Sequence, residues 1–152
     1  PSAPAIAFTD VEGKTRDFRK LPRPMVAGFW IEGCPYCEDM MEVLKSVRQE
    51  SSADALDVVG FFLNEMSSPD VASLGAREGY WVTLAACQPP TELIAALQSS
   101  FNIRGPGRDI YVLDRSGRYR AVSTVDAGGN GRPAVEIKAE VSALLKDVLK
   151  KG

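Results

Sequence analysis

The chain has 152 residues, of which 45% are hydrophobic and 25% are charged, and its net charge is −2. This length and composition suit one well-packed domain over residues 1–152 and exclude a disordered or collagen-like chain. The charge gives no reason to expect a nucleic-acid partner. No apolar run approaches the roughly 20 residues that span a bilayer. The lack of histidine excludes Cys–His and Ser–His nucleophiles.

The chain starts at Pro1 without an initiator methionine, and the small residues that follow resemble the segment after a removed signal peptide or anchor. We therefore expect an exported location, periplasmic or otherwise extracytoplasmic, with a cytoplasmic location as the alternative.

The first half of the chain predicts a β-hairpin followed by two buried strands with a helix between them. Polar turn residues separate the hairpin strands, prolines 22 and 24 interrupt the pattern, and apolar residues at helical spacing mark the helix. The expected elements are a hairpin at 5–8 and 15–18, a strand at 25–31, a helix at 35–50 and a strand at 56–63.

The second half predicts further helices and a closing hairpin. The expected elements are a helix at 69–78, an extended segment at 80–86, a helix at 91–101, a hairpin at 109–113 and 119–124, a glycine-rich loop at 126–132 and a final helix from 133. The last helix is expected to bury one apolar face, formed by Val135, Val141, Leu144, Leu145 and Val148. Alternating strands and helices with a closing hairpin predict an α/β sandwich around a mixed central sheet.

Two cysteines lie where the strand expected at 25–31 gives way to the helix expected at 35–50. Cys34 would occupy the helix N-terminus, where free N–H groups and the helix dipole favour its thiolate, and Cys37 lies one turn further along. Cys34 is thus the predicted nucleophile and Cys37 the predicted resolving thiol, with Pro35 and Tyr36 completing the active-site motif. The acidic neighbours Glu32, Glu38 and Asp39 should limit the lowering of the Cys34 pKa.

Two less reactive roles remain open for this cysteine pair. A zinc site needs four ligands, and without histidine only Cys87 and carboxylates could complete it, so we expect no metal. We also expect no bound cofactor, because the dithiol pair itself would carry the electrons. A purely structural disulfide is the other alternative. Cys87 ends an apolar segment and is predicted to be a buried core residue.

The run from Trp30 to Cys37, followed by a helix, resembles the active site of the thioredoxin superfamily. The N-terminal hairpin and the additional helix between the central strands resemble its TlpA/ResA-like branch of exported thiol-disulfide oxidoreductases, as do residues 10–14, 101–105 and 114–117. The resemblance implies a thioredoxin-like three-layer sandwich with an N-terminal hairpin extension. It also implies exchange with protein thiols and disulfides, supplied by a membrane-bound thiol reductant or oxidant, and we expect the chain to act as a reductant.

The sequence departs from the pattern of these proteins at several positions. Gly28 stands where thioredoxins carry a buried aspartate, Gly33 where a tryptophan commonly precedes the first cysteine, and Met40 where ResA-like proteins carry a glutamate. The proline that faces the dithiol in the family would be Pro106 with a shift of one residue, although counting back from Asp114 reaches Arg108 instead.

Four further residues receive candidate roles. Trp30 and Pro106, with the open position at Gly33, are expected to shape the docking surface, and Glu65 is a candidate for proton relay because it follows a strand at its carboxyl end. Two alternative functions remain. One is a thioredoxin-fold copper chaperone similar to the Sco proteins, and the other is a non-catalytic interaction protein with a permanent disulfide.

Overall fold

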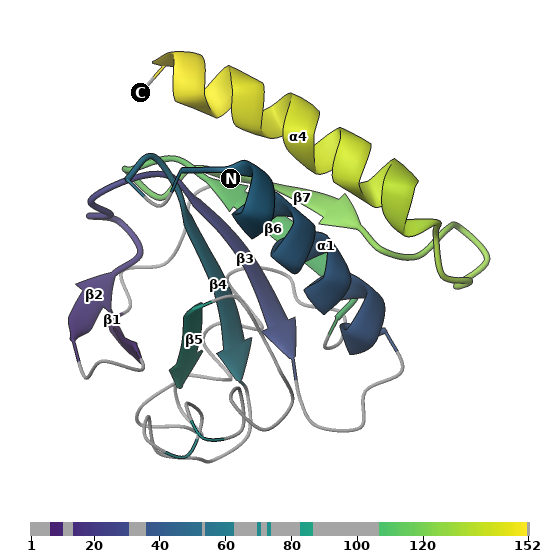
Figure 1. Cartoon of the computed structure of the whole chain (residues 1–152), viewed down its shortest axis with the longest axis horizontal. Coiled ribbons are helices and arrows are strands. Elements are labelled where there is room, and N and C mark those ends of the chain that lie inside the picture. Colours follow the sequence, from purple (N-terminus) through teal and green to yellow (C-terminus); the bar gives the residue numbers. More distant parts are fainter. Residues whose placement is uncertain are drawn as a thin grey trace.

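The computed structural model describes residues 7–10, 14–30, 36–52, 54–62, 70, 73, 83–86 and 107–151. In this part of the chain, seven strands form one sheet in the order β2-β1-β5-β4-β3-β6-β7 (Figure 1). The elements are β1 (Ala7–Asp10), β2 (Thr15–Asp17), β3 (Met25–Trp30), α1 (Cys37–Glu50), β4 (Asp57–Phe62), β5 (Thr83–Ala86), β6 (Asp109–Leu113), β7 (Tyr119–Ser123) and α4 (Ala134–Lys151).

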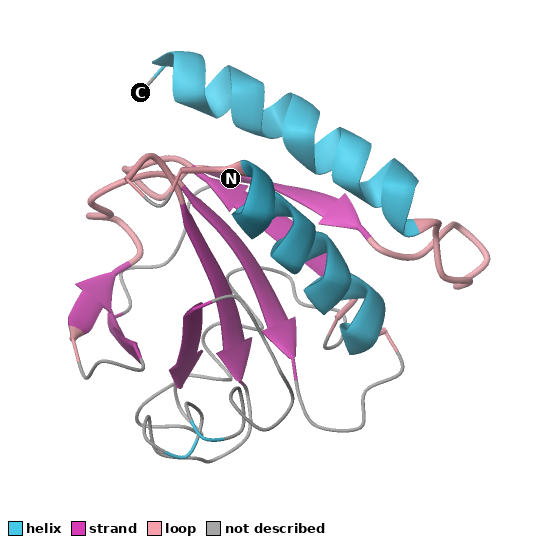
Figure 2. Ribbon diagram, in the orientation of Figure 1, coloured by secondary structure: helices cyan, strands magenta, loops and turns pink. Residues whose placement is uncertain are grey.

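The sheet is mixed, as predicted. β3, β4 and β5 run parallel, and the register between β3 and β4 extends from Met25–Asp57 to Trp30–Phe62. β6 lies antiparallel to β3 and continues into β7, so the predicted closing hairpin is confirmed. β1 and β2 form the predicted N-terminal hairpin, which joins the sheet through antiparallel pairing of β1 with β5 (Figure 2).

The strand β3 is buried on both faces, which explains its unbroken apolar sequence. Val26 and Trp30 belong to the core beneath the helices. On the other face, the ring of Phe29 lies 5.2 Å from that of Phe61 and 5.5 Å from that of Tyr111. The sheet therefore has an aliphatic core on one side and an aromatic cluster on the other.

Helices α1 and α4 lie side by side on the same face of the sheet (Figure 1). The helix α1 begins at Cys37 rather than at the predicted position 35, and it ends at Glu50 as predicted. Its buried residues recur at helical spacing and face the sheet: Cys37, Met40, Met41, Val43, Leu44 and Val47.

The predicted apolar face of α4 needs one correction. Val135 is 82% exposed, whereas Ile137 and Val141 are fully buried. Val135 lies two residues before Ile137, and this spacing places it about 200° around the helix from the buried stripe. The buried face instead repeats at 137, 141 and 145, with Leu144 and Val148 at its margin.

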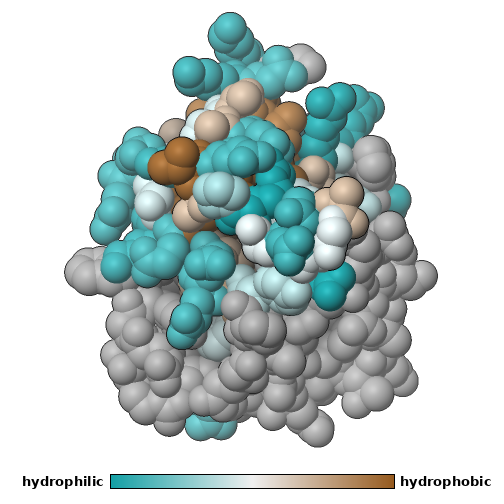
Figure 3. Space-filling model, turned by 90° about the vertical axis from the view of Figure 1, so that its right-hand side faces the viewer, coloured by the Kyte–Doolittle hydropathy of each residue, from teal (hydrophilic) through white to brown (hydrophobic). Residues whose placement is uncertain are grey.

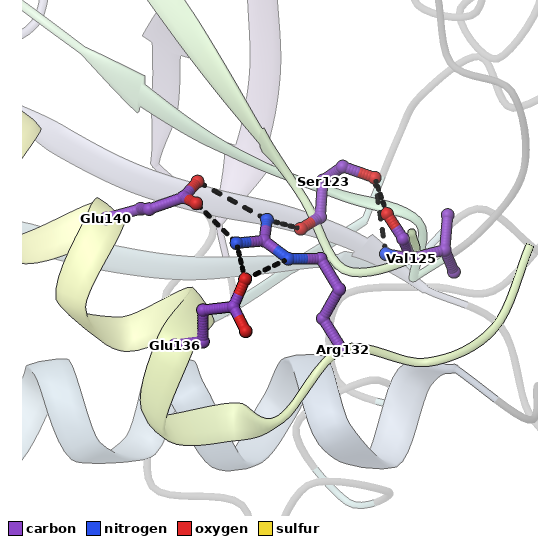
Figure 4. A network of polar contacts seen from close by, with 5 residues as sticks. All are labelled: Ser123, Val125, Arg132, Glu136 and Glu140. Carbon is purple, nitrogen blue, oxygen red and sulfur yellow. Dashed lines mark hydrogen bonds and ion pairs between the residues drawn. The ribbon is translucent and has the colours of Figure 1, made fainter. Parts of the chain in front are cut away.

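A polar network fixes the start of α4 to the end of β7 (Figure 4). The guanidinium of Arg132 donates to the Ser123 carbonyl at 2.7 Å and to Glu136 Oε1 at 2.8 Å, and it also pairs with Glu140. The hydrogen bonds that Arg132 donates to Glu140 and, second, to Glu136 raise the pKa of Arg132 further above its usual value. The fork geometry of arginine thus ties one strand to two turns of the helix.

The helices predicted at 69–78 and 91–101 fall almost entirely outside the described residues. Asp70 and Ser73 are described, and both are helical. Among the described residues, neither α1 nor α4 has the length and apolar character needed to cross a membrane.

Candidate active site at the N-terminus of α1

The site forms where the parallel strands end and α1 begins. Trp30 and Phe62 are paired last residues of β3 and β4, so the carboxyl ends of these strands share one edge of the sheet. In α/β sheets, ligands and reactive groups gather at this edge. The sequence predicted the dithiol at the same place, after β3 and before α1.

Cys37 is the first residue of α1, is 5% exposed and is disulfide-bonded. The preceding residue, Tyr36, is the N-cap, and its side chain makes no capping hydrogen bond. The exposed acids Glu38 and Asp39 occupy the first turn of the helix, where they interact favourably with its dipole. The sulfur of Cys37 therefore lies at a buried helix start whose surface is acidic.

A glycine from the distant loop before β6 packs against this helix start. A Cβ atom on Gly107 would lie 2.8 Å from Cys37 N and 3.0 Å from Cys37 Cα, and the φ angle of Gly107 is +73°. Both facts require glycine at this position. The Gly107 N–H donates to the Phe29 carbonyl at 2.8 Å, and its own carbonyl accepts from Thr124 Oγ1 at 2.6 Å. The loop is thereby held against the first residue of the disulfide-bearing helix.

The ring of Tyr36 is held between a cation and a second loop. The guanidinium of Arg108 lies 5.3 Å from the ring centroid, within cation–π range. The Tyr36 hydroxyl donates to the Gly129 carbonyl at 3.2 Å. Residues from three separate parts of the chain therefore meet at this side chain.

The glycine-rich loop that reaches Tyr36 is closed by one carboxylate. Asp126 Oδ1 accepts from the N–H groups of Gly128 and Asn130, both at 2.9 Å, and the Asp126 N–H donates to the Asn130 carbonyl. This arrangement turns the loop so that the Gly129 carbonyl faces the site. Figure 3 views the molecule from the side on which this loop protrudes, and the described surface there is mostly hydrophilic, with apolar side chains towards the top.

Beneath Cys37 the helix–sheet interface is apolar at positions 28 and 40, where related proteins carry an acid. A Cβ atom on Gly28 would overlap the sulfur of Met40 and lie 2.9 Å from its Cε and 3.2 Å from Leu44 Cδ1. Met40 itself is fully buried. Met40 thus occupies the space beside Gly28 that a larger residue at position 28 would need.

The docking role predicted for Trp30 is not retained. Trp30 is 1% exposed and belongs to the core under α1, because it is an inward-facing residue at the end of β3. A side chain with this burial is not available to a docked chain. It supports α1 from below instead.

The remaining predicted site residues lie outside the described part of the chain: Gly33, Cys34, Pro35, Glu65 and Pro106. The position of Gly107 nevertheless shows where the loop that follows Pro106 meets α1. Among the described residues, no group of three or more cysteine and carboxylate side chains is placed to hold a metal ion.

The sequence reading missed four residues that the structure places at the site: Gly107, Arg108, Thr124 and Gly129. Gly107 and Gly129 contribute through backbone atoms, Thr124 through a hydroxyl bond to the Gly107 carbonyl, and Arg108 through its contact with Tyr36, 72 residues away in the sequence. The sequence indicated this part of the site in one way. The position of the family's proline fell on Pro106 when counted forward along the chain and on Arg108 when counted back from Asp114. Of this segment, the described Gly107 lies against the start of α1 and Arg108 lies over the Tyr36 ring.

Comparison with solved structures establishes the thioredoxin fold. A thioredoxin-like protein from Porphyromonas gingivalis is 18% identical, with a TM-score of 0.67 over 99% of this chain and 93% of that one. A secreted disulfide oxidoreductase of Mycobacterium tuberculosis, homologous to E. coli DsbE, is 17% identical, with a TM-score of 0.62 over 91% of this chain and 96% of its own. Copper-bound ScoI from Arabidopsis thaliana is 11% identical, with a TM-score of 0.70 over 97% and 99%.

At these identities the likeness concerns the fold alone. No family model and no curated protein sequence matches the chain. The fold class predicted from the order of strands and helices is therefore confirmed. The chemistry of the chain has to be inferred from the residues of the site.

Proposed function

We propose that this chain is a thiol-disulfide oxidoreductase that exchanges a Cys34–Cys37 dithiol/disulfide with protein partners. The observation that carries the proposal is the disulfide-bonded Cys37 at the first residue of α1, at the carboxyl edge of the parallel strands. Cys34 is the natural partner because it lies three residues away in the sequence, whereas Cys87 is remote. The thioredoxin fold of the described residues supports the same chemistry.

In the reducing direction, the Cys34 thiolate attacks a disulfide of the partner. The partner's S–S bond breaks, a mixed disulfide with Cys34 forms, and one partner thiolate leaves and takes up a proton. The Cys37 thiolate then attacks the Cys34 sulfur, which releases the second partner thiolate. Two electrons pass to the partner, and the Cys34–Cys37 disulfide remains until a thiol reductant restores it.

We infer that the chain works as a reductant, in an exported compartment. A dithiol becomes strongly oxidising when its reduced form is stabilised as a thiolate. Glu38 and Asp39 oppose a thiolate at the helix start, and this supports a more reducing couple. A membrane-bound thiol reductant would supply the electrons, and folded or unfolded proteins with disulfides would accept them.

Reduction of the interchain disulfides of insulin, driven by dithiothreitol, tests the proposal. Wild type should accelerate the reaction, Cys34→Ser should abolish the acceleration, and Cys37→Ser should accumulate a mixed disulfide. Cys87→Ser is the matched control and should retain the wild-type rate. Full activity of Cys34→Ser would overturn the proposal.

A copper-binding function is the second candidate, and the structural likeness to copper-bound ScoI favours it. Without histidine the chain would bind copper through sulfur ligands, and Cys34 and Cys37 are the candidates because they lie only three residues apart in the sequence. Metal analysis after loading the reduced protein with Cu(I) separates the two functions. Stoichiometric copper that survives dialysis, together with no activity on insulin, would favour this candidate.

A permanent structural disulfide is the remaining alternative. Equilibration of the protein in glutathione buffers measures the reduction potential of the pair. A potential below about −300 mV would indicate a structural bridge, because the glutathione pool does not reduce such disulfides.

A further inference from the structure

A wide groove crosses the end of the sheet opposite to the disulfide. Its volume is about 1250 Å³, and it extends from β2 and the loop after it, past the turn between β6 and β7, to the C-terminal half of α4. These elements meet at the left of Figure 1. The position follows from the register, because Leu113 at the start of this turn pairs with Met25, the first residue of β3.

The described lining of this groove concentrates positive charge. It contains six of the chain's 18 basic residues, Arg16, Arg19, Lys20, Arg115, Arg118 and Arg120, but only three of its 20 acidic ones. The whole chain has a net charge of −2. The groove is therefore a cationic region on an otherwise acidic molecule, and such a region attracts anionic partners.

Four of these cations are exposed and make no ion pair with any described residue: Lys20, Arg115, Arg118 and Arg120. Asp114, the acid nearest in sequence to the three arginines, already accepts hydrogen bonds at Oδ1 from the backbone N–H groups of Ser116 and Arg118, both at 2.9 Å. The carboxylate thus shapes the turn that presents Arg115 and Arg118. Within the described part of the chain, the four cationic heads are therefore open to an external anionic group.

The walls of the groove are fixed before any ligand binds. The Leu21 N–H donates to the Arg115 carbonyl at 3.0 Å and joins the loop after β2 to the β6–β7 turn. Gly117, with a φ of +86°, closes this turn by donating to the Asp114 carbonyl at 3.1 Å. A prearranged groove loses less conformational entropy when it binds a ligand.

The groove also offers apolar contact below its charged rim. Leu144 and Val148 of α4 are partly buried there and keep apolar surface open, and the buried Leu21 and Val112 support them from beneath. The volume exceeds the roughly 300–1,000 Å³ of most small-molecule sites. A concave shape of this size suits a polypeptide segment better than the flat surface of a bilayer.

From these features we propose that the groove is a docking site for an acidic segment of a partner protein, one in which aspartates or glutamates alternate with aliphatic residues. The acidic side chains pair with Lys20, Arg115, Arg118 and Arg120, and the aliphatic ones contact Leu144 and Val148. The six residues of β3 separate the groove from the disulfide by about 20 Å, so a docked partner leaves the redox site open. The proposal is independent of the redox function.

Binding of a fluorescent peptide of repeated Glu-Glu-Leu units tests the proposal, with a Lys-Lys-Leu peptide of equal length as the specificity control. Wild type should bind the acidic peptide saturably and the basic one not at all. Arg115→Glu combined with Arg120→Glu should weaken binding of the acidic peptide about tenfold or more, since each lost pair becomes a repulsion. Raising the salt from about 0.01 M to about 0.15 M should weaken it as well.

The matched control combines Lys146→Glu with Lys150→Glu. These exposed lysines of α4 do not belong to the described lining, and the change in net charge is the same. At about 0.15 M salt this variant should bind the acidic peptide within about twofold of wild type, because the screening length of about 8 Å confines the effect of charges outside the groove. Unchanged thermal unfolding of both variants shows that the fold is intact.

Three outcomes would overturn the proposal. The first is no saturable binding of the acidic peptide by wild type, and the second is equal binding by the Arg115→Glu, Arg120→Glu variant. The third is tighter binding of wild type to phosphatidylglycerol vesicles than to the acidic peptide, which would assign the groove to a membrane surface. Insulin reduction is measured in parallel, so that loss of peptide binding with retained activity separates the groove from the redox site.

Discussion

The thioether of Met40 occupies the space directly beside the Cα atom of Gly28, one turn along α1 from Cys37. Thioredoxins carry an acid at the first of these positions and ResA-like proteins carry one at the second. Here the two positions contact each other as a glycine and a methionine, both of them buried. The glycine at position 28 and the methionine at position 40 are therefore linked by the same packing contact.

Replacing Gly28 with alanine should destabilise the protein by about 1–3 kcal/mol, because the new methyl group overlaps Met40 in a packed core. Urea unfolding measures the loss. The same change in a Met40→Ala background should cost much less, since the truncated side chain leaves room for the methyl group. Equal costs in both backgrounds would show that Met40 does not limit position 28.

Introducing Met40→Glu should speed the resolving step of thiol exchange, because a carboxylate one turn from Cys37 can accept its proton. Burial should raise the pKa of this glutamate above its ordinary value. The variant should then lose stability as the pH rises from about 4.3, the unfolded-state pKa, to the higher folded-state pKa. Stopped-flow exchange and urea unfolding across pH measure both effects.

Met40→Gln is the matched control for this experiment, since it places similar polar bulk at the same position without a titratable group. It should keep the slow resolving step, and its stability should not vary with pH beyond the variation of wild type. A glutamine variant as fast as the glutamate variant would rule out proton transfer as the cause.

The fold was predictable from the sequence because its signals are local. The unbroken apolar run of β3 and the Asp114–Gly117 turn each depend on neighbouring residues, and both are confirmed. The face of α4 was predicted with one error, because counting apolar residues such as Val135 does not reveal which stripe meets the sheet. The contacts of Gly107 and Arg108 with α1 could not be predicted, since loop conformation brings them there.

Gly107→Ala should cost about 3 kcal/mol or more of unfolding free energy, because the methyl group meets the backbone of Tyr36 and Cys37 at a positive φ. Gly129→Ala separates the two causes. Gly129 also has a positive φ, +80°, but a Cβ atom there would have no neighbour within 4 Å. Its substitution should cost only the backbone strain, about 1–2 kcal/mol. Equal losses in urea unfolding would contradict the crowding at Gly107.

Arg132→Lys should lower the unfolding free energy by about 1–2 kcal/mol although the charge is kept. Lysine cannot reach the Ser123 carbonyl and both glutamates at once, because it lacks the planar fork of arginine. The glutamates are half-exposed, so each ion pair contributes modestly and the bond to the strand should dominate. Glu136→Gln, which leaves that bond intact, should cost less than Arg132→Lys, and the reverse order would contradict this ranking.

Tyr36 and Arg108 should be energetically coupled by about 0.5–1 kcal/mol, as expected for a partly exposed cation–π contact. A double-mutant cycle with Tyr36→Leu and Arg108→Ala measures this coupling in urea unfolding. Tyr36→Phe keeps the ring and loses only the hydroxyl bond to Gly129, so its coupling to Arg108 should match that of wild type. In the insulin assay, Tyr36→Leu should raise KM more than it lowers kcat, because it frees the loop beside the cysteines without removing a reacting thiol. A fall in kcat alone would instead show that Tyr36 acts on the chemical step.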